Sequence, residues 1–230
     1  MTSHLDLSYV VGLDLGQARD YSALVVIERE VVSMPYGEDG HLLRSPIRLD
    51  PEYRARHLQR WPLGTAYTTI ARDVAALLDR PPLRRGDTVL ATDQTGVGRA
   101  VIDVLRAAGL EPLCITITGG DAVTSDSDGR RVPKRDLIST IEVLLQQGRL
   151  KIAPELPETP TLIRELDVFR RKLSPAGHDS YGVWREGEHD DLVLAVALAL
   201  WAAEHGSGTI EPLDPELVAE YMGWADRLYR

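Results

Sequence analysis

The amino-acid sequence predicts an α/β fold, with a central mixed β-sheet flanked by helices and a helical appendage at the C-terminus. Two apolar runs joined by a short polar turn, residues 9–16 and 23–32, predict an antiparallel hairpin. A strand, a helix and a second strand follow with short joints over 88–118, which predicts parallel pairing. The helix predicted over 188–205 is apolar on every face, so we expect it to be buried.

The elements between the hairpin and the second parallel strand follow from local patterns. Scattered apolar positions from His41 to Arg48 indicate a third strand, and apolar residues at helical spacing predict a helix from Thr65 to Leu78. The apolar run TVLATD predicts a strand at 88–93. A helix from Arg99 to Ala108 follows, and Gly109 can end it in the left-handed conformation before the strand EPLCITIT begins.

The second half of the chain is predicted to be mainly helical. Residues 119–132 hold almost no apolar side chain, and we interpret them as a mobile loop that contacts the substrate. A helix over 132–147 and a short edge strand at Leu150–Ala153 come next. Thr159 and Pro160 are typical of a helix start, and this helix is expected to run through Lys172.

The remaining elements define the expected domain organisation. A strand is predicted at Tyr181–Trp184, before the buried helix, and an amphipathic helix is predicted to begin at Asp214 and Pro215. With no internal repeat and no long linker, we expect one domain over residues 1–205 and a C-terminal helical tail over 206–230.

Composition excludes several classes of protein. The chain has 230 residues, a formal net charge of −9 and 43% hydrophobic residues, values typical of a globular protein. The apolar run from Leu192 to Ala203 is shorter than the ~20 residues that a membrane span needs. The single cysteine, Cys114, cannot form an internal disulfide, so we expect a reducing, cytoplasmic setting without membrane association.

Three acidic sites stand where an apolar strand ends or the buried helix begins: Asp14, Asp93, and the pair Asp190 and Asp191. Considered singly, each has an ordinary explanation, as a turn residue, a helix cap, or an acid that favours a helix N-terminus. The first strands of the hairpin and of the parallel unit can lie side by side, however, and the carboxylates would then converge. Such a cluster cannot be fully ionised without a cation.

The expected cation is Mg²⁺ or Mn²⁺, because both prefer hard oxygen ligands. Two such ions roughly 4 Å apart can activate a water and stabilise the leaving oxygen of a phosphodiester. Asp190 and Asp191 are expected to differ, because successive helical residues point about 100° apart. His189, directly before the pair, is a candidate to orient a carboxylate or a water.

Other catalytic motifs are missing from the sequence. It contains no phosphate-binding P-loop, no G-x-G-x-x-G after a strand, no G-x-S-x-G elbow and no H-E-x-x-H. The motifs of P-loop, dinucleotide-binding, serine-hydrolase and zincin enzymes are therefore absent from the sequence.

Basic residues indicate where nucleic acid would bind. The net charge of −9 argues against a uniformly basic binding surface, so local clusters must do the positioning. We expect one cluster beside the 119–132 segment to contact phosphates: Arg130, Arg131, Lys134 and Arg135. The next candidate is the cluster from Arg80 to Arg85.

Four segments, taken in order and spacing, resemble the nuclease domain of phage terminase large subunits: GLDLGQARDYSALVVIE, TDQTGVGRAVIDVLRAAGLEPLCITITGG, VPKRDLISTIEVLLQQGRLKIA and HDDLVLAVALALW. The resemblance covers roughly residues 9–205. It implies an RNase H-like (RuvC-like) fold and a two-metal endonuclease that cuts concatemeric viral double-stranded DNA during genome packaging. The family's catalytic and metal-binding acids correspond to Asp14, Asp93, Asp190 and Asp191.

The same resemblance implies further residues and partners. Asp20, in the DYSA segment, is a candidate for a weak or indirect metal contact, and Lys134, in VPKRDL, is a candidate to point toward the acids. The implied partners are double-stranded DNA, a packaging ATPase domain, the small terminase subunit and the portal. Because the P-loop ATPase of the family is not matched, we expect an excised nuclease domain or a free-standing relative that does not translocate DNA.

Three alternatives remain open at this stage. Another RNase H-like nuclease, such as a Holliday junction resolvase, would use the same acids and metals. An actin-like kinase or ATPase shares the D-L-G motif after its first strand but should be longer. A non-enzymatic DNA-binding packaging module would have the fold without activity, which the intact acids disfavour.

Overall fold

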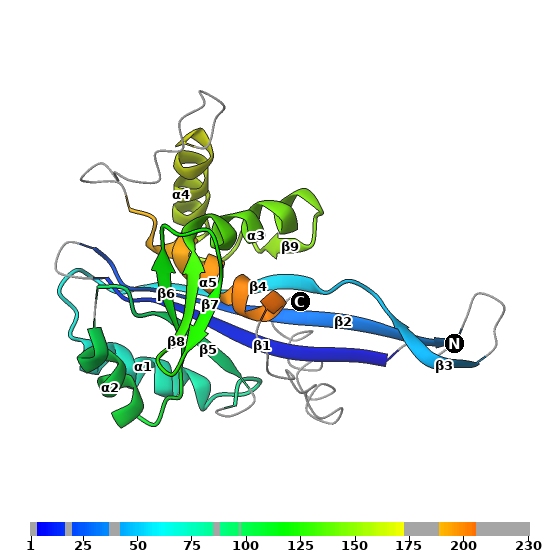
Figure 1. The fold of residues 1–230 in the computed structure, drawn as a ribbon, viewed down its shortest axis with the longest axis horizontal. Helices are drawn as coiled ribbons and strands as arrows, with labels where there is room; N and C mark the ends of the chain where they lie inside the picture. Colours follow the sequence, from blue (N-terminus) through cyan, green and yellow to red (C-terminus); the bar gives the residue numbers. More distant parts are fainter. Residues whose placement is uncertain are drawn as a thin grey trace.

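The computed structural model describes residues 4–16, 20–36, 42–84, 88–96, 98–172 and 189–205. The predicted strand at 181–184 and the predicted C-terminal tail over 206–230 lie outside these residues. Within them, the chain forms nine strands and five helices (Figure 1). The strands are β1 (His4–Asp14), β2 (Ala23–Tyr36), β3 (Leu42–Arg48), β4 (Glu52–Arg60), β5 (Val89–Asp93), β6 (Leu113–Thr118), β7 (Thr124–Asp126), β8 (Gly129–Pro133) and β9 (Leu150–Ile152). The helices are α1 (Tyr67–Leu78), α2 (Gly98–Ala107), α3 (Lys134–Gln146), α4 (Thr159–Lys172) and α5 (Asp191–His205).

All the described strands belong to one mixed sheet, in the order β7-β8-β6-β5-β1-β2-β4-β9, with β3 paired to β2. β1, β2 and β4 are antiparallel neighbours, whereas β5 and β6 are added in parallel on the other side of β1. An antiparallel meander extended by parallel strands beside its first strand is the arrangement of the RNase H-like fold. The fold class predicted from the sequence is therefore confirmed.

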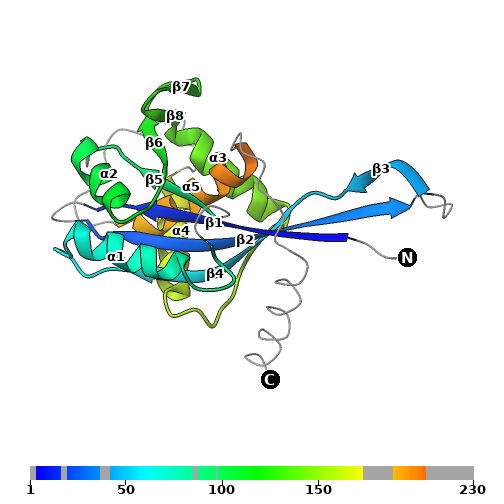
Figure 2. The same ribbon diagram turned by 90° about the horizontal axis from the view of Figure 1, so that it is seen from below.

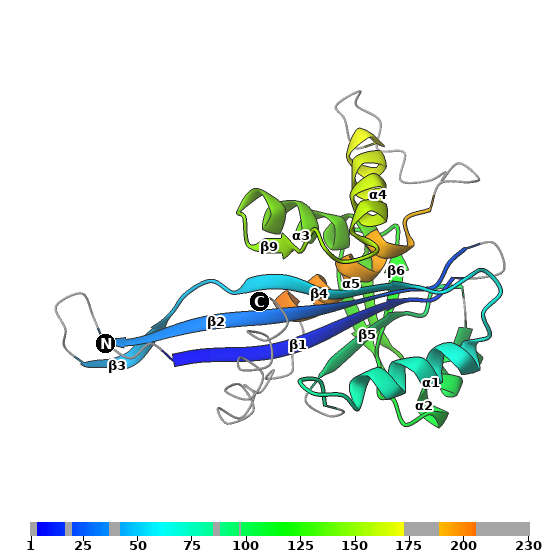
Figure 3. The same ribbon diagram turned by 180° about the vertical axis from the view of Figure 1, so that it is seen from behind.

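Helices cover both faces of the sheet and divide the core in two. α3, α4 and α5 pack on one face, and α1 and α2 pack on the other (Figures 1 and 3). The side chains of β1 alternate between them, since Val10 joins the cluster around α5 and Val11 joins the cluster around α1 and α2. β1, β2 and β3 continue beyond the helices as a long ribbon (Figure 2).

Helix α5 lies closer to strand β1 than a side chain at position 12 would allow. It is buried along its length, as its uniformly apolar sequence predicts. A Cβ atom at Gly12 of β1 would overlap the carbonyl oxygen of Ala195 in α5. Glycine at this position therefore lets the helix backbone touch the strand, which sets where the N-terminus of α5 stands relative to the strand ends.

Most elements predicted from the sequence are confirmed, including the antiparallel hairpin, the parallel β5–α2–β6 unit and the edge position of β9. Gly109 and Gly148 follow α2 and α3 with φ of 76° and 66°, the left-handed conformation that ends a helix. Cys114 is buried and free. Among the described helices, none is long and apolar enough to cross a membrane.

Two elements differ from the sequence-based expectation. β4 was not predicted, because basic residues occupy its less buried positions and pair across the sheet, as Arg56 Nη2 does with Glu28 Oε1 at 2.6 Å. The interpretation of 119–132 as a loop is wrong, because β7 and β8 form a hairpin there. Its turn ends at Gly129, with φ of 138°. β8 is held by parallel pairing to β6 and by Val132, which is buried in the core.

The close approach at Gly12 makes a stability prediction. Replacing Gly12 by Ala forces α5 away from the sheet, so we expect the free energy of unfolding to fall by about 2–3 kcal/mol, the usual cost of overpacking a core. Gly119→Ala is the control, because nothing lies within 4 Å of a Cβ placed there. Urea unfolding measures both variants, and equal stabilities would contradict the close contact.

Candidate active site

Two acids lie side by side at the carboxyl ends of parallel strands. The β1–β5 register pairs Leu13 with Thr92, so the next residues, Asp14 and Asp93, occupy matching positions. Thr92 Oγ1 also donates a hydrogen bond to the carbonyl oxygen of Leu13 at 3.1 Å and ties the two strand ends together. Gly12 of β1 faces α5, and Asp14 follows it by two residues. The Asp14 side chain therefore faces the layer of α5 as well.

The remaining two acids stand at the N-terminus of α5. The first backbone hydrogen bond of the helix runs from Leu194 N to the carbonyl oxygen of Asp190, at 2.8 Å, so Asp190 is the capping residue and Asp191 the first helical one. Asp191 is 4% exposed, and its Oδ2 is buried with no hydrogen-bond partner in the described part of the chain. His189 Nδ1 lies 3.7 Å from this oxygen.

The electrostatics show that these carboxyl groups lie near one another. Burial raises the pKa of Asp14 well above its usual value, and the negative charges of Asp93, Asp191, Asp190 and Asp20 raise it further. The structure therefore brings together acids that are separated by more than 170 positions in the sequence. Mutual repulsion at this edge of the sheet is the cost of the arrangement.

The other two buried acids respond to different surroundings. Burial raises the pKa of Asp93, but the backbone N–H of Thr95 donates to Asp93 Oδ1 at 2.7 Å and opposes the rise. Burial and the neighbouring Asp190 charge raise the pKa of Asp191 to about 7. Asp93 thus has one oxygen engaged in a turn, whereas Asp191 has a buried oxygen that nothing described satisfies.

The expected supporting residues lie around the cluster. Lys134 begins α3, and its half-buried Nζ is 3.6 Å from Asp190 Oδ2. His189 contacts Asp191, as described above, and Asp20 is exposed but close enough to raise the pKa of Asp14. Asp190 and Asp191 consequently differ in their neighbours, with an ammonium beside the first and an imidazole beside the second.

The basic residues expected to bind DNA are placed on the β7–β8 hairpin and at the start of α3. Arg130 Nη1 donates to Ser125 Oγ at 2.7 Å, Arg131 Nη1 lies 3.5 Å from Asp126 Oδ2, and Arg135 Nη1 lies 2.6 Å from Asp121 Oδ1. These partners belong to the hairpin and the segment before it. The guanidinium groups are held near the surface by these partners, where a phosphate could compete for them.

Whether the site fits a metal ion depends on its donor atoms. Among the described residues, no three His, Cys, Asp or Glu side chains already lie in an arrangement that could hold one ion. The donors are all carboxylate oxygens, which suit Mg²⁺ or Mn²⁺. The buried Asp191 Oδ2 without a hydrogen-bond partner is the kind of atom that a cation would satisfy, so the residues present fit a hard divalent ion.

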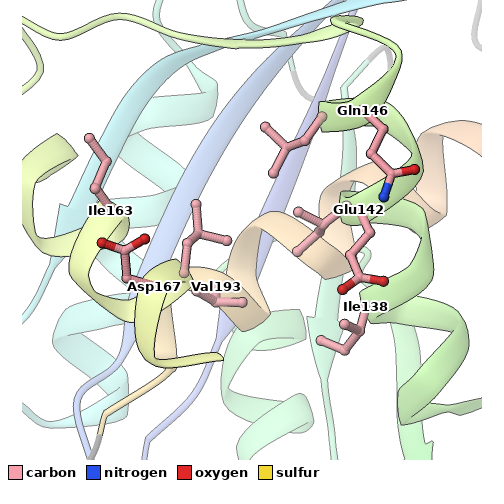
Figure 4. Close-up of a pocket in the computed structure, with 9 residues that line it drawn as sticks. Ile138, Glu142, Gln146, Ile163, Asp167 and Val193 are labelled. Carbon is pink, nitrogen blue, oxygen red and sulfur yellow. The ribbon is translucent and has the colours of Figure 1, made fainter. Parts of the chain in front are cut away.

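A separate cavity of about 390 Å³ lies between α3, α4 and α5 (Figure 4). Its lining is mostly apolar, with Glu142, Gln146 and Asp167 as the polar members. None of the four expected catalytic acids lines it. The cavity therefore belongs to the helical layer and not to the acidic edge of the sheet.

Sequence reasoning missed three residues that surround the N-terminus of α5: Arg60, Tyr21 and Glu165. Burial raises the pKa of Glu165 to about 7, although the backbone N–H groups of Val193 and Leu192 donate to it. The inward orientation of Glu165 could have been predicted from the sequence, because Glu165 follows the buried Leu162 by three positions and shares its helix face. The contacts of Arg60 and Tyr21 depend on tertiary structure and leave no local pattern.

Comparison with solved structures finds several similar chains, two of which follow. The first is the crystal structure of the large terminase nuclease from thermophilic phage G20c, at 22% sequence identity and a TM-score of 0.48, covering 84% of this chain and 81% of that one. The second is the human cytomegalovirus terminase nuclease domain, soaked with Mn, at 12% identity and a TM-score of 0.47, covering 93% and 87%. No family model matches the sequence, and no curated protein matches it. Both structures are terminase nucleases, the proteins that the sequence motifs resemble.

The raised pKa of Asp191 predicts how stability changes with pH. A carboxyl group whose folded pKa lies above its unfolded value costs stability when ionised, and this cost appears as pH rises from about 4 through 7. Asp191→Asn removes it. In EDTA, we expect the melting temperature of the variant to approach that of the unaltered protein near pH 4.5 and to exceed it by several degrees at pH 8.

The control for this experiment is Glu155→Gln, which replaces an exposed carboxylate far from the cluster in the sequence. Its melting temperature should follow that of the unaltered protein at every pH. A difference between Asp191→Asn and the unaltered protein that stays constant from pH 4.5 to 8 would contradict the raised pKa.

Proposed function

We propose that this chain is a metal-dependent endonuclease that hydrolyses phosphodiester bonds of double-stranded DNA, of the kind found in terminase large subunits. The observation that carries the proposal is that Asp14 is buried at one edge of the sheet, where burial raises its pKa and the nearby charges of Asp93, Asp191 and Asp190 raise it further. Burying like charges in this way is costly unless a cation joins them. The motif order in the sequence supports the same proposal.

In the proposed mechanism, Asp14 and Asp93 would hold metal ions from the strand ends, and Asp190 and Asp191 would hold them from the helix. Two divalent ions held by these residues would supply an activated water and stabilisation of the leaving oxygen of the phosphodiester. The fixed register of β1 and β5 sets the spacing of the strand acids. The backbone N–H of Thr95 donates to Asp93 Oδ1 and so orients the Asp93 carboxylate.

Lys134 and His189 have supporting roles in this proposal. The ammonium of Lys134, beside Asp190, offsets part of the negative charge and can contact a phosphate oxygen at the edge of the cluster. The imidazole of His189 orients the Asp191 carboxylate. Asp20 is exposed and its charge reaches Asp14, so it would make a weak or indirect contact with a bound metal ion.

The proposal extends to domain organisation and partners. We propose that residues 1–205 are the nuclease domain and that 206–230 form a separate helical tail. Double-stranded DNA is the proposed substrate. A packaging ATPase domain, the small terminase subunit and the portal are the partners that the terminase resemblance implies.

Cutting of supercoiled plasmid tests the proposed activity. We expect nicked and linear products with Mn²⁺ or Mg²⁺ and none with EDTA, with little sequence preference. Asp14→Asn and Asp93→Asn should each abolish cutting, because each removes a proposed metal ligand. Their melting temperatures should equal or exceed that of the unaltered protein, because each substitution also removes a repelling charge.

The control variant is Asp103→Asn, which changes a carboxylate on the exposed side of α2 and should cut normally. Cutting in EDTA would refute the metal mechanism. Preferential cutting of a four-way junction over linear duplex would instead favour a Holliday junction resolvase.

The basic hairpin makes a separate prediction about DNA binding. Replacing Arg130 and Arg131 together by Ala removes two proposed phosphate contacts, so we expect weaker duplex binding and a salt dependence reduced by about one to two counterions. Fluorescence anisotropy in Ca²⁺ at several salt concentrations measures both quantities. Arg72→Ala, on the exposed face of α1, is the control. An unchanged affinity and slope for the hairpin variant would shift the interface toward the Arg80–Arg85 cluster.

A further inference from the structure

The N-terminus of α5 is capped by a residue of another helix. The backbone N–H groups of Leu192 and Val193, the second and third residues of α5, donate to Glu165 Oε2 of α4 at 3.0 and 3.2 Å. These donors have no acceptor inside the helix. In most helices the side chain of the capping residue accepts them, and in α5 that residue is Asp190.

Asp190 lies beside Lys134 and near the strand acids. It is of the type that caps helices well, yet the amide groups it would ordinarily cap are bonded to Glu165. The carboxylate of Asp190 lies instead beside Lys134, with Oδ2 3.6 Å from Nζ, and close enough to Asp14 to raise its pKa. Glu165 thus replaces Asp190 at the helix end, and Asp190 faces the other acids.

Arg60 fixes Glu165 to the sheet. Its Nη1 lies 3.4 Å from Glu165 Oε1, and its guanidinium stacks 4.0 Å above the ring of Tyr21. Arg60 pairs with Ala23 across β4 and β2, and Ala23 pairs with Asp14 across β2 and β1. Arg60 is consequently in the same cross-strand row as Asp14, about 10 Å away at two strand spacings.

Tyr21 completes the surroundings of the helix end. Its ring meets the ring of His189 edge-on, with centroids 4.8 Å apart, and His189 in turn contacts Asp191. Glu165 itself is 6% exposed, so solvent does not compete for its hydrogen bonds. The capping contact is therefore buried and shielded from water.

We propose that Glu165, anchored by Arg60, is a positioning residue that caps α5 in place of Asp190 and so keeps Asp190 and Asp191 directed at the strand acids. This inference rests on the proposed function, because it concerns the same acids. It assigns to Glu165 no contact with metal or DNA. Without the Glu165 carboxylate, Asp190 turns to cap its own helix and leaves the cluster.

The test compares Glu165→Leu with Glu165→Gln. Leu fills a similar volume but accepts no hydrogen bond, whereas Gln retains an acceptor for the helix amides. We expect the Mn²⁺ concentration for half-maximal binding, measured by titration calorimetry on folded protein, to rise at least about tenfold for Glu165→Leu, the usual effect of removing a ligand's support. Glu165→Gln should stay within about threefold. Cutting should follow the same metal dependence and recover in part at saturating Mn²⁺.

Glu204→Gln is the matched control. Glu204 lies at the other end of α5, about 20 Å away along the helix axis, and bonds Tyr53 and Arg149 at 2.7 and 2.8 Å. Losing this carboxylate disturbs α5 without touching its N-terminus, so the Mn²⁺ midpoint should not change. A purely structural role of Glu165 would lower the melting temperature of Glu165→Leu and leave its midpoint unchanged, which would overturn the proposal.

Two further measurements keep the proposal falsifiable. If Glu165→Leu does not fold, Arg60→Met tests the same chain of contacts and should raise the midpoint by about threefold or more. A metal-free crystal structure of the folded variant should show the Asp190 carboxylate accepting from the amides of Leu192 and Val193, and an unmoved Asp190 would overturn the proposal. Failure of the unaltered protein to bind Mn²⁺ would refute the proposed function instead, and this metal-free structure would still decide the role of Glu165.

Discussion

The burial of several carboxylates near one another at one edge of the sheet is the constraint on which the site depends. Asp14, Asp93 and Asp191 are each less than a tenth exposed, and their pKa values are all raised, with burial as the main cause. A protein can keep such a cluster only if the rest of the fold holds it in place. The strand register, the close contact of α5 and the capping of its N-terminus all contribute to that support.

Each of these supports comes from a different level of structure. The parallel register of β1 and β5 is set by backbone hydrogen bonds, so it places two acids without help from their side chains. The contact at Gly12 sets the distance between α5 and the sheet. Glu165 and Arg60 then fix the direction in which the first turn of α5 points. Together they bring three distant segments of the chain to one place.

The sequence predicted the parts of the fold that local patterns determine. Uniform apolar character identified α5, and the apolar runs before Asp14 and Asp93 identified β1 and β5, so these acids could be placed at strand ends before the structure was known. β4 has too few apolar residues for such a pattern, because cross-strand ion pairs accompany its burial. The β7–β8 hairpin has few buried apolar residues, with Val132 in the core, and it joins the sheet largely by backbone pairing, to which side-chain patterns are insensitive. The capping of α5 by Glu165 joins positions 27 residues apart, which no local rule anticipates.

Anomalous diffraction from crystals soaked in Mn²⁺ tests the central claim most directly. The account predicts manganese peaks at the edge where β1 and β5 end, within about 2.3 Å of carboxylate oxygens of Asp14 and Asp93 and of at least one of Asp190 and Asp191. Crystals without peaks at this edge, or with peaks only at exposed acids elsewhere on the surface, would contradict it.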